Sequence, residues 1–171
     1  MICDICDVAM KSRIATREDP YAFTMVGLPN VQLVGLRAHR CPRCLGDIAE
    51  IPRMQELHRV IAAMVVRKSG LLTGAEIRYL RIHAELPAKD FARLLRVSPS
   101  TLSRVESDKQ AFSESLDQMV RLISTVIAQD GESARQVLLA TAEGRKRKRR
   151  TQPRLFKVRR GHWEEVANAA A

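Results

Sequence analysis

Two Cys-x-x-Cys pairs constrain the fold of this chain more than any other feature, because they contain all four of its cysteines. The pairs are Cys3 with Cys6 and Cys41 with Cys44. Each pair brings two sulfur atoms close enough to bind one ion, and together they supply the four thiolates that tetrahedral zinc prefers. We therefore predict one structural Zn²⁺ per chain, bound by Cys3, Cys6, Cys41 and Cys44.

The residues around the second pair favour a metal-binding turn. Pro42 stiffens it, and Gly46 is expected to take the positive φ that lets backbone amides point at a thiolate. Two disulfides or four unrelated thiols are the alternative, but the paired spacing and the lack of a secretory leader after Met1 favour a metal. Iron could bind the same four ligands. We prefer zinc, because the sequence places no aromatic residues around the pairs. His39 is interpreted as an exposed histidine or a neighbour of the ligands.

The length of 171 residues allows one large core or two small ones, and 34 residues separate Cys6 from Cys41. We predict a mainly α protein in which a small β zinc-knuckle domain precedes an all-α helix-turn-helix domain. Alternation in residues 21–26 and 31–36 predicts two short strands, held together by the metal rather than by apolar area. The expected divisions are a zinc-binding domain over 1–51, a helical linker over 52–70, a helix-turn-helix domain over 71–144 and a basic, flexible tail over 145–171.

Capping residues and apolar periodicity place the helices of the second part. Pro52 is expected to open a helix that ends near Gly70, and its narrow apolar stripe suits an internal core or a second chain equally. Thr73 is a candidate N-cap, and so is Ser98, which Pro99 follows at the first helical position. The expected helices run over 73–85, 88–95 and 100–106, with others from about 115 and over 133–142.

The helix over 100–106 is the candidate DNA reader. It is expected to bury Leu102 and Val105, which turns small hydroxyl side chains and one arginine outward, a surface that suits a major groove. Basic residues just before it, Arg93 among them, are candidates for phosphate contacts. The predicted DNA-contacting residues are Ser100, Thr101, Ser103, Arg104, Lys89 and Arg96.

Arg104 is the residue expected to read a base, because a bidentate arginine contact to guanine gives about 1–3 kcal/mol of discrimination. The alternative is a surface ion pair between Arg104 and Glu106 or Asp108. We expect Glu106 to accept a hydrogen bond or ion pair that steadies the helix, since a carboxylate repels phosphate.

The net charge of +10 comes from one segment near the end of the chain. Residues 145–160 hold ten basic residues and no acidic one, and the remaining residues sum to zero. Such a block repels itself and is expected to order only on a polyanion, adding salt-sensitive affinity through phosphate contacts. A solubilising tail and an RNA-binding arm are the alternatives. The predicted tail contacts are Arg145, Lys146, Arg147, Lys148, Arg149 and Arg150.

Other function classes find little support. There is no nucleophile paired with a histidine, no phosphate-cradling glycine loop and no spaced carboxylate pair, so no enzyme is predicted. No apolar run approaches the roughly 18 residues needed to span a bilayer, so no membrane association is expected. We expect a soluble, cytoplasmic protein.

The motifs also follow a characteristic order: a Cys-x-x-Cys pair, Tyr21-Ala-Phe23, Val31-x-Leu33-x-Gly35-Leu36, the second pair and then the helix-turn-helix. In this order the chain resembles the MqsA-type antitoxins and related regulators, which join a YgiT-like zinc finger to an Xre-like helix-turn-helix domain. The resemblance covers about residues 1–130. It implies zinc at the four cysteines, a homodimer formed through the C-terminal domain, and binding to a palindromic operator on double-stranded DNA.

The segment Ser100-Thr-Leu-Ser-Arg-Val-Glu106 is similar to the family's recognition pattern Asn-x-x-Ser-Arg-x-Glu. The resemblance places Arg104 on the family's DNA-reading arginine and Ser103 on a serine positioned for a phosphate. The chain departs from the pattern at Ser100, at Pro87-Ala-Lys89, where Xre-type domains usually have Ser-Gln-Lys, and at Arg96, which replaces a turn glycine. The basic tail has no counterpart in the short antitoxins.

Together these features predict a dimeric, zinc-stabilised, sequence-specific DNA-binding repressor of its own or a neighbouring promoter. The second interpretation is an antitoxin whose zinc domain neutralises a ribonuclease toxin and whose DNA binding is autoregulatory.

Overall fold

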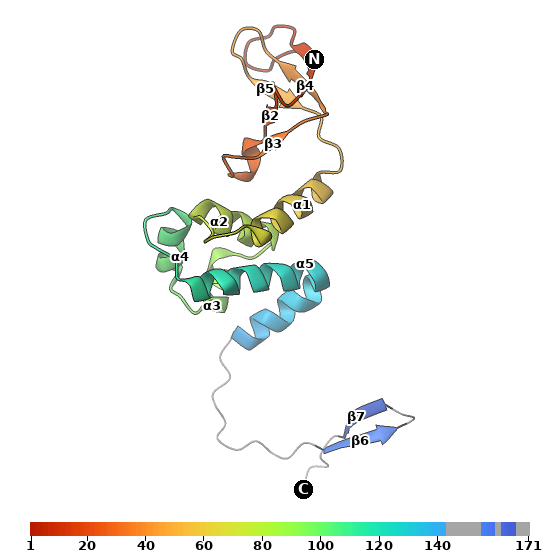
Figure 1. Ribbon diagram of the computed structural model, residues 1–171, viewed down its shortest axis with the longest axis vertical. Coiled ribbons are helices and arrows are strands. Elements are labelled where there is room, and N and C mark those ends of the chain that lie inside the picture. The colour runs from red at the N-terminus through yellow and green to blue at the C-terminus, as the bar shows by residue number, and fades with distance from the viewer. Residues whose placement is uncertain (143–154, 160–161, 167–171) are drawn as a thin grey trace.

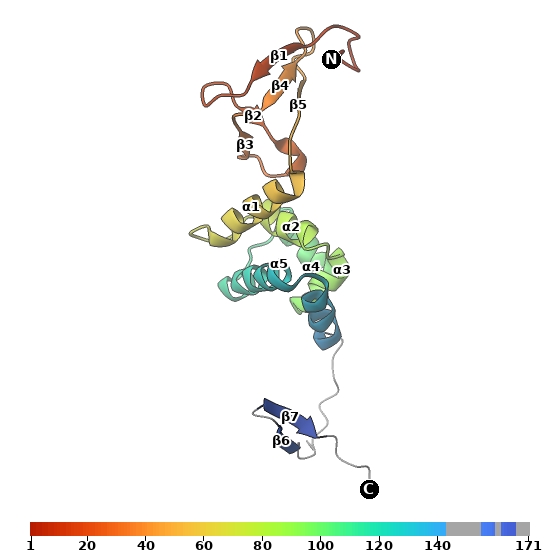
Figure 2. The same ribbon diagram turned by 90° about the vertical axis from the view of Figure 1, so that its right-hand side faces the viewer.

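The computed structural model describes residues 1–142, 155–159 and 162–166. A small β domain lies at one end, and α1 (Met54–Arg67) leads from it into a cluster of helices (Figures 1 and 2). Those helices are α2 (Gly74–His83), α3 (Ala88–Leu94), α4 (Pro99–Glu106) and α5 (Glu114–Ala142). The predicted fold class, mainly α with a small β domain first in the chain, is confirmed.

The β domain contains two antiparallel sheets. One has the strand order β1-β4-β5, and the other pairs β2 with β3. In the larger sheet His39 lies opposite Ser12 on one side and Ile48 on the other. The strands are β1 (Lys11–Ile14), β2 (Tyr21–Ala22), β3 (Gln32–Leu33), β4 (Arg37–Arg40) and β5 (Asp47–Ala49).

The strands expected over 21–26 and 31–36 are shorter in the structure. After β2 the chain forms a 3₁₀ turn over Thr24–Val26, which Gly27 ends with a φ of 71°. Beyond β3, Gly35 takes a φ of 78° and turns the chain toward β4. β1 and β5 were not predicted, because each is short and carries too little apolar alternation to be recognised.

The caps of α2 and α4 are those that the sequence predicts. Thr73 accepts a hydrogen bond from the amide of Glu76, and the Glu76 carboxylate accepts one from the amide of Thr73, which completes a capping box. Ser98 caps α4 by accepting from the amide of Thr101, and Pro99 occupies the first turn. Both helices therefore begin where local chemistry satisfies their free amides.

α5 spans the two helices expected from about 115 and over 133–142. It changes direction at Gly131, whose φ of 56° and ψ of −126° are not helical. Glycine tolerates this conformation because it has no Cβ. Beyond the kink Ala134 is buried, and Arg135 donates to the carbonyl of Glu85, just after α2, at 3.2 Å.

One continuous core joins the β domain to the helices. Phe23 of the β domain belongs to the same buried cluster as Ile61 and Val65 of α1. The rings of Phe23 and His58 lie 6.1 Å apart, and the His58 ring is stacked on Tyr79 of α2 at 6.2 Å. The apolar stripe of the helix expected after Pro52 thus packs inside the chain.

An arginine and an aspartate of α5 fix the connection between α1 and α2. The Arg121 guanidinium donates to Asp117 Oδ2 at 2.6 Å, and the buried Asp117 accepts the amide of Leu72 through Oδ1 at 2.7 Å. Arg121 also donates to the last carbonyls of α1 and its connection, those of Val66, Lys68 and Gly70. These bonds replace the missing helical partners at the end of α1. Sequence reasoning did not find them, because they join residues about fifty positions apart.

A β-hairpin near the end of the chain corrects one expectation. β6 (Leu155–Arg159) pairs antiparallel with β7 (His162–Val166), and Val158 lies opposite Trp163. The polar segment around Trp163 predicts a loose turn, and the structure has a strand there instead. The strand pattern is hard to recognise in the sequence, because charged residues are interspersed with the apolar ones. The tail contacts predicted at Arg145–Arg150 lie outside the described residues.

Candidate metal centre and nucleic-acid interface

The four cysteines, separated by up to 41 positions in the sequence, meet at the tip of the β domain. Their sulfur atoms all lie within 4.8 Å of one another. Cys3 and Cys41 are buried, whereas Cys44 is exposed. The Sγ atoms of Cys3 and Cys44, which belong to different pairs, are 3.7 Å apart. The two pairs therefore form one four-sulfur site.

Both pairs use the same backbone geometry. The amide of Cys3 donates to the carbonyl of Val8, and the amide of Cys41 donates to that of Gly46, each at 2.9 Å. The return bonds run from Asp7 to Cys3 and from Leu45 to Cys41 at 2.9 and 3.1 Å. Each loop therefore closes in the same way around its two sulfurs.

The left-handed residue of the second loop is Leu45, with a φ of 59°, and not Gly46 as expected. Asp7, with a φ of 53°, occupies the equivalent position in the first loop. At Gly46 a Cβ would lie 3.4 Å from the sulfur of Cys44. A side chain at this position would therefore touch the Cys44 sulfur at ordinary contact distance.

Hydrogen bonding and burial shift the pKa values of two of the thiols in opposite directions. The amides of Cys44 and Arg43 lie 3.5 and 3.4 Å from the Cys41 sulfur, and these hydrogen bonds lower the pKa of the Cys41 thiol to about 6. Loss of hydration, with the neighbouring Cys44 and Cys41 sulfurs, raises the pKa of the Cys6 thiol to about 12. Four thiolates cannot share this site unless a cation compensates their charge. Metal binding must therefore displace the Cys6 proton, and metal affinity should rise with pH.

The site fits a tetrahedral metal ion. A tetrahedron with metal–sulfur bonds of about 2.3 Å has sulfur–sulfur edges of about 3.8 Å, and the Cys3–Cys44 separation of 3.7 Å matches such an edge. Four thiolate ligands would close the coordination sphere, which is the pattern of structural sites. The four cysteines can therefore hold a metal ion without a fifth ligand.

His39 is not part of the four-sulfur group. It is only 9% exposed, so the expectation of an exposed histidine is wrong, and its Nε2 lies 3.5 Å from Glu50 Oε1. Its place in the middle strand of the sheet explains the burial.

The second candidate site is the outer face of α4. Leu102 and Val105 are buried as predicted, and Ser100, Ser103 and Arg104 are exposed. Thr101 is half-buried, and its hydroxyl lies 2.8 Å from that of Ser98. The Ser98 hydroxyl lies equally close to Ser100, so the capping serine orders the hydroxyls at the start of the helix.

Arg104 forms no ion pair with any residue that the structure describes. The two carboxylates proposed as its alternative partners are both engaged elsewhere. Glu106 accepts two hydrogen bonds from Arg81 of α2, at 2.6 and 3.0 Å, and Asp108 accepts the amide of Gly74 at 2.7 Å. The ion pair expected for Glu106 is therefore present, and it leaves Arg104 available for a ligand.

Gly74 is a functional position that sequence reasoning missed. A Cβ there would lie 2.2 Å from the carbonyl oxygen of Val105 and 2.8 Å from the carbonyl carbon of Glu106. Only glycine lets the start of α2 approach the end of α4 this closely. No local pattern marks such a glycine, because its neighbours are more than thirty positions away.

The other basic candidates differ in their availability. Lys89 and Arg96 are exposed, and Arg96 holds the left-handed position of the turn between α3 and α4, with a φ of 58°. Arg93 is half-buried and pairs with Asp90 one helical turn earlier. Lys89 near the start of α3 and Arg96 in the turn before α4 are thus exposed, whereas Arg93 is paired.

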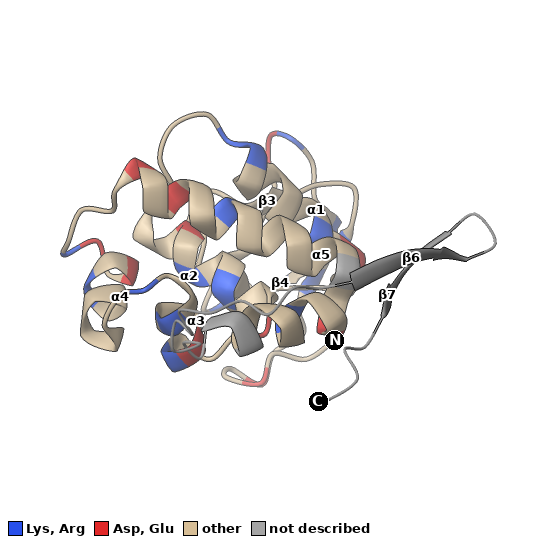
Figure 3. Cartoon of the chain, turned by 90° about the horizontal axis from the view of Figure 1, so that it is seen from below, with Lys and Arg blue, Asp and Glu red and all other residues tan. Residues whose placement is uncertain are grey.

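Acidic and basic residues are interspersed over the described helices (Figure 3). This agrees with the zero net charge of the chain outside residues 145–160. No helix in the described residues is both long and apolar enough to cross a membrane.

Comparison with known proteins supports the second site. No curated protein and no solved structure matches the chain. Residues 73–135, which include α2, α3, α4 and the first part of α5, match the model of a family described as a helix-turn-helix domain. The chain therefore carries a helix-turn-helix domain, the type of domain found in DNA-binding regulators, next to a four-cysteine cluster able to bind a metal.

Proposed function

We propose that this protein is a sequence-specific DNA-binding transcriptional regulator that represses its own or a neighbouring operon. Two features of α4 support the proposal. Its Glu106 is bound to Arg81, and its Arg104 is exposed and forms no ion pair within the described part of the chain. A helix that presents Arg104 beside small hydroxyl groups suits direct reading of base edges in the major groove. Such a protein works where the DNA is, in the cytoplasm.

The proposed contacts divide into two classes. Arg104 reads a base, and Ser100, Thr101 and Ser103 contact base edges or phosphates close to it. Lys89 and Arg96 contact the phosphate backbone, which positions α4 without reading sequence.

We assign zinc to the four-cysteine site, one ion per chain with a structural role. Thiolates favour zinc among common cellular metals, and a closed four-sulfur set leaves no position for a substrate. The ion would stabilise the β domain rather than react.

The protein is proposed to bind a palindromic operator as a homodimer, since two-fold protein symmetry matches a two-fold DNA site. Met119, Leu122 and Val126 of α5 are exposed at helical spacing, 40%, 65% and 37% respectively, which supports a second chain packing there. This is also what the resemblance to the MqsA-type family implies.

Arg104→Ala should weaken binding to the specific operator by about 5- to 150-fold, because it removes about 1–3 kcal/mol of base recognition. Binding to unrelated DNA should change little. Arg17→Ala is the matched control, since Arg17 is an exposed arginine of the β domain outside residues 73–135. Fluorescence anisotropy on both DNAs measures the effect. Equal loss of affinity in the two variants would mean that Arg104 contributes only general positive charge.

The basic block at 145–150 should make binding steeply dependent on salt. Replacing its six basic residues with serine should lower the slope of log affinity against log salt by up to about five units, while operator preference stays. This variant keeps the β6–β7 segment, and deletion of 145–171 provides the comparison. Loss of operator preference in the serine variant would mean that the block reads sequence.

An antitoxin is the second candidate function. The β domain exposes large apolar side chains, with Ile5 at 85%, Met25 at 80% and Leu45 at 71%, and such residues support a protein partner. A ribonuclease toxin encoded beside the gene should then co-purify with the chain and lose activity on binding. A neighbouring gene product that does not bind would remove this candidate.

A further inference from the structure

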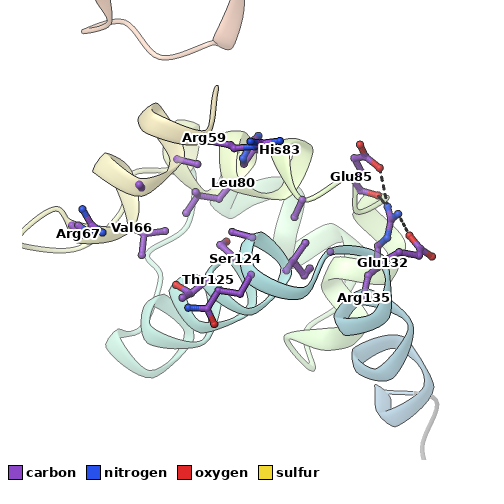
Figure 4. A pocket seen from close by; sticks show the side chains of 17 residues that line it. Arg59, Val66, Arg67, Leu80, His83, Glu85, Ser124, Thr125, Glu132 and Arg135 are labelled. Carbon is purple, nitrogen blue, oxygen red and sulfur yellow. Dashed lines mark hydrogen bonds and ion pairs between the residues drawn. The ribbon is translucent and has the colours of Figure 1, made fainter. Parts of the chain in front are cut away.

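A cavity of about 590 Å³ lies between α1, α2 and α5, away from both sites described above. Figure 4 shows its lining, with Leu80 and Val66 on the apolar side and Ser124 and Thr125 opposite. Cavities of about 300–1,000 Å³ are the size that binds small molecules. Neither the proposed DNA contacts nor the metal site accounts for it.

Small residues create the cavity. Ala62 and Ala63 on α1, Ala84 on α2 and Ala128 on α5 all line it, where larger side chains would fill the space between the helices. The kink at Gly131 then turns the end of α5 across one side.

An ion-pair network closes that side. Arg135, beyond the kink, donates to the backbone carbonyl of Glu85 at 3.2 Å and pairs with the carboxylates of Glu85 and Glu132 (Figure 4). Its charge is therefore compensated within the protein. The wall is held in place by contacts between residues 50 positions apart.

The opposite side carries uncompensated positive charge. Arg59 and Arg67 line the cavity from α1, are exposed, and form no ion pair with the described part of the chain. His83 lies beside Arg59 (Figure 4), and burial lowers the pKa of His83, with His58 and Arg59 adding to this effect. Near neutral pH the histidine is uncharged, and the two arginines define the polarity of the entrance.

We propose that this cavity binds a small molecule with an apolar body and a single anionic head group, such as a hydrophobic carboxylate or sulfonate. The apolar body lies against Ala63, Val66 and Ile127, and the head group binds Arg59, which lies beside His83. Guanidinium groups suit this role because they bind planar anions through paired hydrogen bonds. The basic tail of the same chain is a poor occupant, because its charge has the same sign as that of the arginines.

A ligand in this cavity would lie against α2, which an ion pair joins to α4. Leu80, His83 and Ala84 line the cavity from α2, and Arg81 of the same helix binds Glu106 of α4. Helix α2 thus connects the cavity to α4, the proposed DNA-reading helix.

The proposal is tested with a matched pair of fluorescent probes on the full-length protein. Anilinonaphthalenesulfonate has an apolar body with one sulfonate, and N-phenylnaphthylamine has the same body without charge. The wild type should bind the sulfonate at least about 10-fold more tightly than the neutral probe, a difference of about 1.4 kcal/mol. Equal affinity for the two probes would overturn the selection of an anion.

Two variants locate the binding site. Arg59→Gln with Arg67→Gln should abolish the preference for the sulfonate but leave binding of the neutral probe, whereas Ala128→Leu should weaken both probes by filling the cavity. Arg78→Gln is the control, because Arg78 is an exposed arginine of α2 outside the cavity. Circular dichroism confirms that each variant is folded. Unchanged sulfonate binding in the double glutamine variant would show that the cavity is not the anion site.

Discussion

Cys41→Ser should release the metal and melt the tip of the β domain. The buried cluster around the cysteines contains only Cys3, Met10 and Cys41, so little apolar area can replace the metal. Structural zinc contributes about 10–16 kcal/mol of binding free energy in zinc-finger peptides, and loss of one ligand should remove much of it. Elemental analysis should show loss of the ion, and a thermal melt should show a new transition at lower temperature.

The control for this experiment is Arg43→Ala in the same loop. Arg43 is exposed, and only its backbone amide interacts with the Cys41 sulfur, a contact that the alanine retains. This variant should keep a full equivalent of metal. A Cys41→Ser protein that also keeps one metal per chain would contradict the four-cysteine site.

Metal uptake by the wild type should also release protons and strengthen as the pH rises. The Cys6 thiol, with a pKa raised to about 12, is protonated at neutral pH and must lose its proton to bind. The Cys41 thiol, with a pKa lowered to about 6, is already ionised there and loses its charge only as the pH falls through about 6. Protonation of both thiols therefore lowers the affinity for the metal as the pH falls.

Gly74→Ala should destabilise the helix-turn-helix domain by about 3 kcal/mol or more. The new Cβ would overlap the backbone of α4 at 2.2 Å, and relieving the overlap would break the hydrogen bond from Gly74 to Asp108. Overpacking costs about 1–3 kcal/mol, and a buried polar group without its partner costs about as much again. Chemical denaturation measures the change, and operator affinity should fall with it because α4 is displaced.

Gly70→Ala separates this steric effect from the general cost of replacing a glycine. Gly70 has a φ of 81°, but a Cβ there would meet nothing within 4 Å. Its replacement should therefore cost only about 1–2 kcal/mol, the strain of a left-handed residue. If the two variants lose equal stability, the close packing of α2 on α4 is not the cause.

The elements that sequence reasoning placed well are those whose causes are local. Thr73 with Glu76 and Ser98 with Pro99 are capping patterns within a few residues, so the starts of α2 and α4 follow from the sequence. The four cysteines were also identifiable, because their paired spacing is a strong sign of a metal site.

The features that sequence reasoning missed depend on contacts between distant residues. Arg121 looks like an ordinary helical arginine until α5 is packed against the end of α1. Gly74 has no recognisable role until α4 lies beside it. The left-handed position at Leu45 was assigned to Gly46 because glycine is the usual residue there, yet the loop geometry set by Cys41 decides the position.

Reading of DNA sequence through α4 is measured most directly by a titration of the purified wild-type protein. Its affinity for the DNA upstream of its own gene is compared, at physiological salt, with that for a scrambled duplex of the same composition. We expect a preference of at least about 10³-fold for the upstream DNA, the lower end for specific regulators. Equal affinity for both duplexes would contradict it and leave only binding through the basic segment.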